Sequence, residues 1–274
     1  MMSHKNREAK RTAREELYAQ REQEKARAKR KRTLIAAGGV VVVLAAAAGI
    51  GVAVADHDSG GGSDSAGPVV APRGAIGKDN LVIPVGAADA PSTLTVYEDF
   101  RCPACDAFEK GFTPTIHSLE DDGQIRTEYH LVTLIDGNLG GSGSLNAGNA
   151  AACAQDQGKF RAFHDVLFSN QPDEQDDAFS KNATLLTLAA KVPGLTSAAF
   201  TSCVERGTHK EWVRKSDAAF NSAGFDSTPT VLLNGKNIYG SGAAVLTPAS
   251  LKKMVADANK GKQPGTVTAS ASPS

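Results

Sequence analysis

Two cysteines separated by two residues carry the clearest chemistry in this sequence. Cys102 and Cys105 enclose Pro-Ala, after an apolar, β-prone stretch at 92–97 and before a helix-compatible stretch at 106–119. A C-x-x-C at a strand-to-helix junction puts the first sulfur at a helix N-terminus, where unpaired N–H groups and the helix dipole favour the thiolate. The second thiol lies one turn on, where it can close on the first or displace a bound partner. The pattern therefore predicts dithiol–disulfide exchange.

Half of a zinc site, or a structural disulfide, is the other interpretation of this pair. Zinc needs two further ligands, and the sequence has neither a second C-x-x-C nor an H-x₃₋₅-H. We therefore expect no metal, and no dissociable cofactor is required for exchange between sulfurs. The six histidines are scattered, and His164, between Phe163 and Asp165, is interpreted as a packed or locally capped helix residue.

The chain has four cysteines, which permit three pairings. Adjacency pairs Cys102 with Cys105 and leaves Cys153 with Cys203, both in predicted helices. Outside the membrane two spare thiols are more often oxidised than free, so a structural disulfide is expected. Closing a loop of about 50 residues contributes about 4 kcal/mol in the chain-entropy model. A second redox relay is the alternative role for this pair.

The N-terminal part of the chain has the composition of a membrane anchor. Residues 1–32 hold twelve Lys and Arg against five Asp and Glu, and 33–55 are 23 residues without a charge. As a helix, 33–55 spans about 34 Å, enough for a bilayer core of about 30 Å. The positive-inside rule then predicts that 1–32 is cytoplasmic and the remainder extracytoplasmic. A cleaved signal peptide ending at Ala53-Val-Ala55 is the alternative, although these regions are longer than is typical of one.

The remainder of the chain divides into three parts. Residues 56–80 are rich in Gly, Ser and Pro and are predicted to be a flexible linker. Residues 81–260 are long enough for one core, and 261–274 are small and polar, which predicts a disordered tail. A nucleic-acid role for the basic arm 1–32 is the weaker interpretation, because Glu residues are interspersed in it and it adjoins the predicted span.

The pattern of the folded part predicts an α/β sheet with a helical insertion at about 144–223. Apolar and alternating stretches predict strands at 81–85, 94–100, 125–134, 230–233 and 238–239. Helical spacing predicts helices at 147–168, 183–191, 197–206 and 209–222, and a last helix from 248. Gly158 is a possible break, Asn234-Gly235 is a hairpin turn, and Ser144 and Thr247 are expected helix N-caps.

Five short motifs, in this order, carry a resemblance to a known family. They are Gly86-Ala-Ala-Asp-Ala-Pro91, Glu98-Asp-Phe-Arg-Cys-Pro-Ala-Cys105, Gln157-Gly-Lys-Phe160, Phe163-His-Asp165 and Ser227-Thr-Pro-Thr230. Over residues 81–260 the sequence resembles the DsbA-like branch of the thioredoxin-fold oxidoreductases. The resemblance implies a thioredoxin fold with an inserted helical lid, preceded here by one transmembrane helix.

The resemblance also implies roles for residues around the motif. Cys102 is the nucleophile that forms mixed disulfides, and Cys105 is the more buried resolving thiol. Pro229 is expected to be a cis proline packed against the C-x-x-C, and Thr228 to offer backbone hydrogen bonds to an extended substrate segment. The expected activity is the oxidation of dithiols in newly exported proteins by a bacterial, membrane-tethered enzyme. A membrane quinone reductase of the DsbB or vitamin-K-epoxide-reductase (VKOR) type would re-oxidise it.

Two positions depart from the family pattern. The buried acid that such enzymes often carry six residues before the first cysteine is replaced by Val96. Glu98 lies on the same face of an ideal strand and could exchange protons with Cys105, or it could be solvated. The dipeptide Pro103-Ala104 lacks the histidine of the strongest oxidants, which predicts a milder oxidant.

Two other functions remain open at this point. The chain could be a reductase or isomerase fed by a membrane electron donor. It could also be a thioredoxin-fold binding or assembly module whose C-x-x-C is vestigial or only structural. The intact motif together with Pro229 argues against the binding module.

Overall fold

The computed structural model describes residues 67–240 and 245–267. The basic segment at 1–32 and the expected membrane span at 33–55 lie outside these residues. Within the described ranges, no helix has the length and apolar character needed to cross a membrane.

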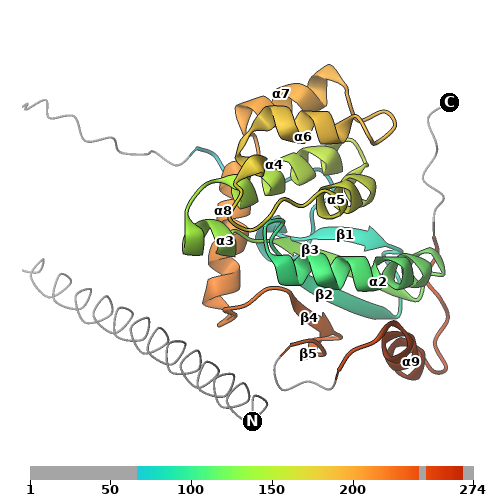
Figure 1. Ribbon diagram of the computed structural model, residues 1–274. Helices are drawn as coiled ribbons and strands as arrows, with labels where there is room; N and C mark the ends of the chain where they lie inside the picture. The colour runs from blue at the N-terminus through green and yellow to red at the C-terminus, as the bar shows by residue number, and fades with distance from the viewer. Residues whose placement is uncertain (1–66, 241–244, 268–274) are drawn as a thin grey trace, which may run out of the picture. The chain divides into compact units, whose positions relative to one another are not determined.

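A mixed five-stranded sheet forms the centre of the described domain (Figure 1). In spatial order its strands are β1 (Ile83–Gly86), β3 (Ile125–Leu131), β2 (Ser92–Glu98), β4 (Thr230–Leu233) and β5 (Lys236–Asn237). β2 and β3 are parallel, and the other neighbouring pairs are antiparallel. Every second residue of β2 is buried, from Ser92 to Glu98, so one side of this central strand faces the core.

Helices cover both faces of the sheet. Figure 1 shows α2 (Pro103–Asp121) lying along one face, and α9 (Pro248–Ala258) packs beside it. On the other face the ring of Tyr97 stacks on His130, with ring centroids 4.2 Å apart, and contacts Phe220 of α8 (Lys210–Ser222). The sheet is therefore enclosed between helices, as the α/β prediction requires.

A block of helices is inserted between β3 and β4, as predicted. It comprises α3 (Leu134–Leu139), α4 (Gly143–Asp156), α5 (Phe160–Ser169), η2 (Ala178–Ser180), α6 (Asn182–Ala189), α7 (Ala198–Arg206) and α8. The alanine-rich α4 is buried on most of its surface and contacts α5, α6, α7 and α8. A disulfide of 2.03 Å joins Cys153 of α4 to Cys203 of α7.

The start of this block confirms one prediction and differs from another. The helical stretch expected at 147–168 is broken at Gly158, which has a φ of 65° and lies between α4 and α5. Ser144 does not cap α4, because the helix already begins at Gly143. Instead, the Asp136 carboxylate of α3 accepts hydrogen bonds from the N–H groups of Ser144 and Leu145, at 3.0 and 2.9 Å. A tertiary contact therefore caps the helix where a local one was expected.

The last two predicted features are close to those observed. Asn234 and Gly235 both have positive φ, 49° and 82°, as a tight hairpin turn needs. The hairpin's second strand is β5, so the strand expected at 238–239 was placed too late along the chain. Thr247 caps α9 and forms a capping box with Ser250, which confirms the N-cap prediction.

The packed chain extends beyond both expected limits of the folded part. In the stretch assigned to the linker, the Val70 carbonyl lies 2.8 Å from His209 Nδ1, and the Asn80 carbonyl accepts a 2.6 Å hydrogen bond from Trp212 Nε1. In the stretch assigned to the tail, the Gly265 N–H donates to the Gly123 carbonyl at 2.8 Å. Buried ring nitrogens need partners, and these backbone carbonyls supply them.

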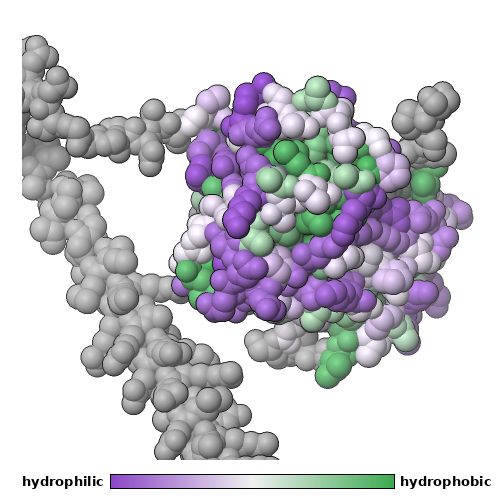
Figure 2. Space-filling model, turned by 45° about the horizontal axis from the view of Figure 1, so that its top comes forward, coloured by the Kyte–Doolittle hydropathy of each residue, from purple (hydrophilic) through white to green (hydrophobic). Residues whose placement is uncertain are grey.

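The surface of the described domain leaves few large apolar side chains in solvent. The face in Figure 2 is largely hydrophilic, with one central area of hydrophobic residues and a few smaller groups at its edges. The exposed large hydrophobic residues are Val69, Val70, Leu139, Val245 and Val267. Most of the apolar surface is therefore in the core.

Candidate active site

The C-x-x-C motif lies at the junction of β2 and α2. After β2 ends at Glu98, a turn is closed by a 3.0 Å hydrogen bond from the Cys102 N–H to the Asp99 carbonyl. Cys102 is the N-cap of α2, and Pro103 occupies the first position of the helix, where a missing N–H costs nothing. The strand-to-helix placement of the motif is therefore as predicted.

The two sulfurs, present as free thiols, lie in different environments. Cys102 is 6% exposed and Cys105 is fully buried. The hydrogen bond from Cys105 lowers the pKa of Cys102 from 9.0 to about 6, aided by Thr228 and by the N–H groups of Cys105 and Ala104 and opposed by burial. Burial, then the hydrogen bond and charge of Cys102, raises the pKa of Cys105 well above that of an ordinary thiol. The two environments thus favour the thiolate at Cys102 and the protonated thiol at Cys105.

The loop before β4 approaches Cys102 from the side of the sheet. Antiparallel pairing places Thr230 opposite Tyr97, which brings residues 228–229 beside the motif. The Thr228–Pro229 peptide bond is cis. The Thr228 carbonyl accepts a 3.4 Å hydrogen bond from Cys102 Sγ, and Thr228 contributes to the lowered pKa of that thiol. Thr228 therefore lies directly beside the Cys102 sulfur.

Gln171, which the sequence analysis did not single out, holds the backbone of the motif. Its Nε2 donates hydrogen bonds of 3.0 Å to the carbonyls of Phe100 and Cys102. Gln171 follows α5, so the insertion directly supports the turn that presents Cys102. No local pattern marks such a contact, because 69 residues separate Gln171 from Cys102.

Arg101 connects the same turn to other residues of the insertion. Its guanidinium is buried and lies 2.7 Å from Asp136 Oδ1 and 3.1 Å from Asp177 Oδ1. It also donates to the carbonyls of Gly140 and Glu174. These contacts fix Arg101, the residue next to Cys102. The only signal of them in the sequence is an Arg immediately before the first cysteine.

Asp99 braces the turn through its carboxyl group. It accepts hydrogen bonds of 2.8 Å from the N–H groups of Arg101 and Ile135. Complete burial raises its pKa to about 7 against the lowering effect of these bonds. Asp99 therefore joins the turn to the start of α3.

Glu98 lies under the motif rather than in solvent. It is 1% exposed, and its Oε1 is 3.0 Å from Nε2 of His164 on α5, which is 2% exposed. The charge of Glu98 contributes to the raised pKa of Cys105. His164 is packed in a helix, as the sequence analysis expected, but it is paired with a carboxylate whose charge acts on the buried thiol.

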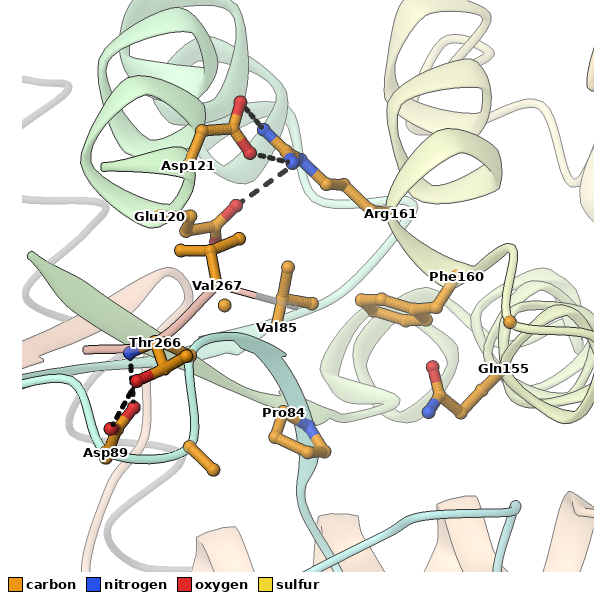
Figure 3. Close-up of a pocket in the computed structure, with 14 residues that line it drawn as sticks. Pro84, Val85, Asp89, Glu120, Asp121, Gln155, Phe160, Arg161, Thr266 and Val267 are labelled. Carbon is orange, nitrogen blue, oxygen red and sulfur yellow. Dashed lines mark hydrogen bonds and ion pairs between the residues drawn. The ribbon is translucent and has the colours of Figure 1, made fainter. Parts of the chain in front are cut away.

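One cavity lies away from the motif. It measures about 790 Å³ and follows the edge strand β1, with Pro84, Val85 and Phe160 on its walls (Figure 3). At one end Arg161 pairs with Asp121 at 2.6 Å, and at the other Thr266 donates to Asp89 at 2.7 Å. Neither motif cysteine lines it.

Comparison with known proteins begins with the family. The thioredoxin family profile matches residues 79–257. Disulfide bond formation protein D of Bacillus subtilis is 26% identical over 157 residues, which are 56% of this chain and 68% of that protein. The serine/threonine-protein kinase PknE of Mycobacterium tuberculosis is 28% identical over 154 residues, which are 53% of this chain but only 27% of the kinase.

Solved structures give the same result. The reduced disulfide bond oxidoreductase DsbG of Mycobacterium tuberculosis is 31% identical with a TM-score of 0.57, over 67% of this chain and 89% of that one. Oxidised DsbA of the same organism is 31% identical with a TM-score of 0.56, over 67% and 94%. The family profile, over residues 79–257, spans the sheet, the insertion and the C-x-x-C together. The chain belongs to the thioredoxin family, in its DsbA-like branch of thiol:disulfide oxidoreductases.

Proposed function

We propose that this protein introduces disulfides into exported proteins by exchange at Cys102 and Cys105. The observation that carries the proposal is the contrast between the two sulfurs. The pKa of Cys102 is lowered to about 6, whereas burial raises that of Cys105. A stabilised thiolate favours the reduced state of the pair, which makes the oxidised pair a better oxidant.

The exchange proceeds in two steps with balanced electrons. A substrate thiolate attacks Cys102 Sγ of the oxidised pair, the Cys102–Cys105 bond breaks, and Cys105 leaves with the electron pair and takes up a proton. A second substrate thiolate then attacks the substrate sulfur of the mixed disulfide and releases Cys102 as a thiolate. The substrate gains a disulfide and the protein holds two electrons in its dithiol. No dissociable cofactor takes part.

Thr228 and Pro229 position the substrate in this proposal. They lie beside the reactive sulfur, with the Thr228 carbonyl 3.4 Å from Cys102 Sγ. An extended substrate segment would pair with the backbone here, and its sulfur would then lie against Cys102. Glu98 exchanges the proton that Cys105 gains and loses.

The proposed cellular setting rests on the N-terminal sequence and the family. Residues 33–55 anchor the protein in the cell membrane, with 1–32 in the cytoplasm and the catalytic domain outside. The natural partners are exported proteins with free thiols and a quinone-linked re-oxidase of the DsbB or VKOR type. Disulfides persist in that compartment, which suits both the activity and the Cys153–Cys203 bridge.

Trapping of mixed disulfides tests the proposal. In Cys105→Ala the Cys102 thiolate attacks a disulfide of an exported substrate, and one substrate sulfur leaves as a thiol. No neighbouring thiol can then displace the bound substrate, so adducts should accumulate through Cys102 and disappear on reduction. Cys102→Ala, the matched control, should trap few, because Cys105 is buried and its pKa is raised. The measurement is the amount of reducible high-mass adduct after rapid alkylation. No adducts with folded Cys105→Ala would mean that the pair is structural, as a binding module requires.

A further inference from the structure

The cavity along β1 has acidic side chains at both of its ends. Glu120 and Asp121, from the last turn of α2, lie at one end, and Asp89, which follows β1, lies at the other (Figure 3). The charged residues of the lining are these three carboxylates and Arg161, so negative charges exceed positive ones by two. Hydrogen bonds from Thr266 lower the pKa of Asp89, and those from Arg161 lower the pKa of Asp121. The cavity therefore favours a cation.

Glu120 is the carboxyl group of this cavity that lacks donors. It is 1% exposed, and neither of its oxygens accepts a hydrogen bond in the described residues. Its ion pair with Arg161 Nε is 3.4 Å long, because the two terminal nitrogens of Arg161 donate to Asp121 at 2.6 and 3.1 Å (Figure 3). A buried oxygen without a donor is costly, so a ligand that donates to Glu120 would satisfy a group that the fold leaves unsatisfied.

The other positively charged side chains near this cavity do not balance it. Arg126 reaches the wall, where it donates to the Ala88 carbonyl at 3.1 Å, but its guanidinium pairs with Glu128 at 2.5 Å. Lys159 precedes α5 and does not line the cavity. Residues 268–274, which follow the last lining residue, contain neither Lys nor Arg. These groups therefore leave the excess negative charge of the cavity in place.

Helix ends add to the negative character of the wall. α2 ends at Asp121 and α4 ends at Asp156, beside the lining residue Gln155, and a helix C-terminus carries a partial negative charge. α5 begins at Phe160 with the opposite polarity, but the cation of its first turn, Arg161, is already paired with Asp121. Two C-termini thus face one N-terminus across the cavity.

Apolar side chains separate the two acidic ends. Figure 3 shows Val85 and Val267 between the Glu120 side and the Asp89 side, and Phe160 extends the apolar wall. The volume of about 790 Å³ is within the range of about 300–1,000 Å³ that is usual for organic ligands. Among the described residues, the groups close enough to hold a metal ion lie elsewhere. The arrangement suits an elongated molecule with charged ends and an apolar middle.

We propose that this cavity binds an elongated organic dication, an aliphatic chain with an ammonium group at each end. One ammonium group donates to Glu120 and the other to Asp89, and the chain between them lies against Val85 and Val267. Free diamines have this chemistry, and so do two lysine side chains of one polypeptide segment. Neither motif cysteine lines the cavity, so binding is independent of the proposed exchange reaction.

Calorimetric titration with linear diamines tests the proposal. The full-length protein is held in nanodiscs of zwitterionic phosphatidylcholine, at an ionic strength that screens weak surface attraction. The series runs from propane-1,3-diamine to octane-1,8-diamine. Because two carboxyl groups set the spacing, the affinity should pass through one maximum. There the diamine should bind about tenfold or more tightly than the monoamine of equal length, which lacks one charge-assisted hydrogen bond. A flat series, or no binding, would overturn the proposal.

Two variants each remove the charge at one end. Glu120→Gln and Asp89→Asn should each weaken binding of the best diamine about tenfold or more and abolish the length preference. Asn at 89 keeps an oxygen for the Thr266 N–H. The matched control is Asp122→Asn, because Asp122 is exposed at the end of α2 and outside the lining. Wild-type affinity in folded Asp89→Asn would contradict the proposal even where Glu120→Gln fails to fold.

A peptide separates the two sources of the dication. Acetyl-Lys-Ala-Lys-amide that binds more tightly than the best diamine, and loses affinity in both variants, would assign the site to a polypeptide segment. Binding of the diamine alone would assign it to a free amine. Stoichiometric displacement of the diamine by Ca²⁺ or Mg²⁺ would instead identify a metal site and overturn the proposal. Mixed-disulfide trapping through Cys102 should be equal in Asp89→Asn and the wild type, so the proposed function and this site fail separately.

Discussion

At the scale of single residues, the two thiols differ because α2 begins between them. Cys102 precedes the helix and is surrounded by donors, whereas Cys105 points into the core within the first turn. Their environments follow from position in the fold, and other residues hold that position. Gln171 bonds the carbonyl groups of Phe100 and Cys102 and so fixes the backbone on which the first sulfur lies.

Replacing Gln171 should therefore impair both stability and exchange. Gln171→Ala leaves two carbonyls of the motif without their donor, so the free energy of unfolding should fall by about 1–3 kcal/mol. The rate of exchange at Cys102 should fall several-fold, because its backbone is less fixed. Denaturant unfolding and the alkylation rate of Cys102 measure the two effects.

The matched control is Gln155→Ala. Gln155 also donates to a backbone carbonyl, that of Arg73, but in an exposed place away from the motif. Gln155→Ala should lower the free energy of unfolding by less than Gln171→Ala does, and it should leave the alkylation rate of Cys102 unchanged. Equal effects of the two substitutions on the alkylation rate would show that Gln171 does not position the motif.

At the scale of elements, the insertion supports the motif and is itself crosslinked. α4 is the centre of the insertion, and the Cys153–Cys203 disulfide joins it to α7. Two residues of the insertion's loops contact the motif: Asp177 pairs with Arg101, and Gln171 donates a hydrogen bond to the Cys102 carbonyl. The disulfide therefore stabilises the scaffold without contacting the reactive sulfurs.

Removing that disulfide should separate stability from activity. Cys153→Ala with Cys203→Ala opens a loop of 50 residues, so the free energy of unfolding should fall by about 4 kcal/mol. Oxidation of a dithiol substrate should continue at the wild-type rate below the lowered melting temperature. Loss of turnover in a double variant that is still folded would support the redox-relay alternative for this pair.

The elements also show what the sequence can predict. Strands and the motif's place at a strand-to-helix junction follow from local periodicity, and the N-cap at Thr247 follows from its residue type before Pro248. The cap of α4 could not be predicted, because its acceptor is Asp136, eight residues before Ser144 and on another helix, α3. The contact of Gln171 with the motif and the pairing of Glu98 with His164 depend on tertiary packing. Such contacts between distant residues produce no periodic pattern in the sequence.

At the scale of the whole molecule, the two faces of the sheet have different tasks. Glu98 lies at the end of β2 on the face that contacts α5, and the two thiols lie at the start of α2. The opposite face, under α8, is an aromatic layer in which His130 stacks on Tyr97. Burial lowers the pKa of His130 to about 4, so this histidine is neutral in the folded protein at physiological pH.

His130 should make the protein less stable in mild acid. Its pKa is about 4 when folded and 6.5 when unfolded, so protonation favours the unfolded chain. The contribution of this group to the free energy of unfolding should be level above the unfolded pKa of 6.5 and fall by about 3 kcal/mol as the pH falls to about 4. His130→Phe keeps an aromatic ring against Tyr97 and should remove that part of the loss. Urea unfolding across this pH range measures it, and an identical pH dependence in the variant would contradict the assignment.

The most direct test of the proposed function is the reduction potential of the Cys102–Cys105 couple. Equilibration with glutathione buffers at pH 7, followed by acid quench and alkylation, gives its value. A thiolate stabilised to a pKa of about 6, without the extra histidine of the strongest oxidants, should place it between about −200 and about −120 mV. A value near thioredoxin's, at about −270 mV or below, would contradict a disulfide-forming role and assign the protein to the reductases.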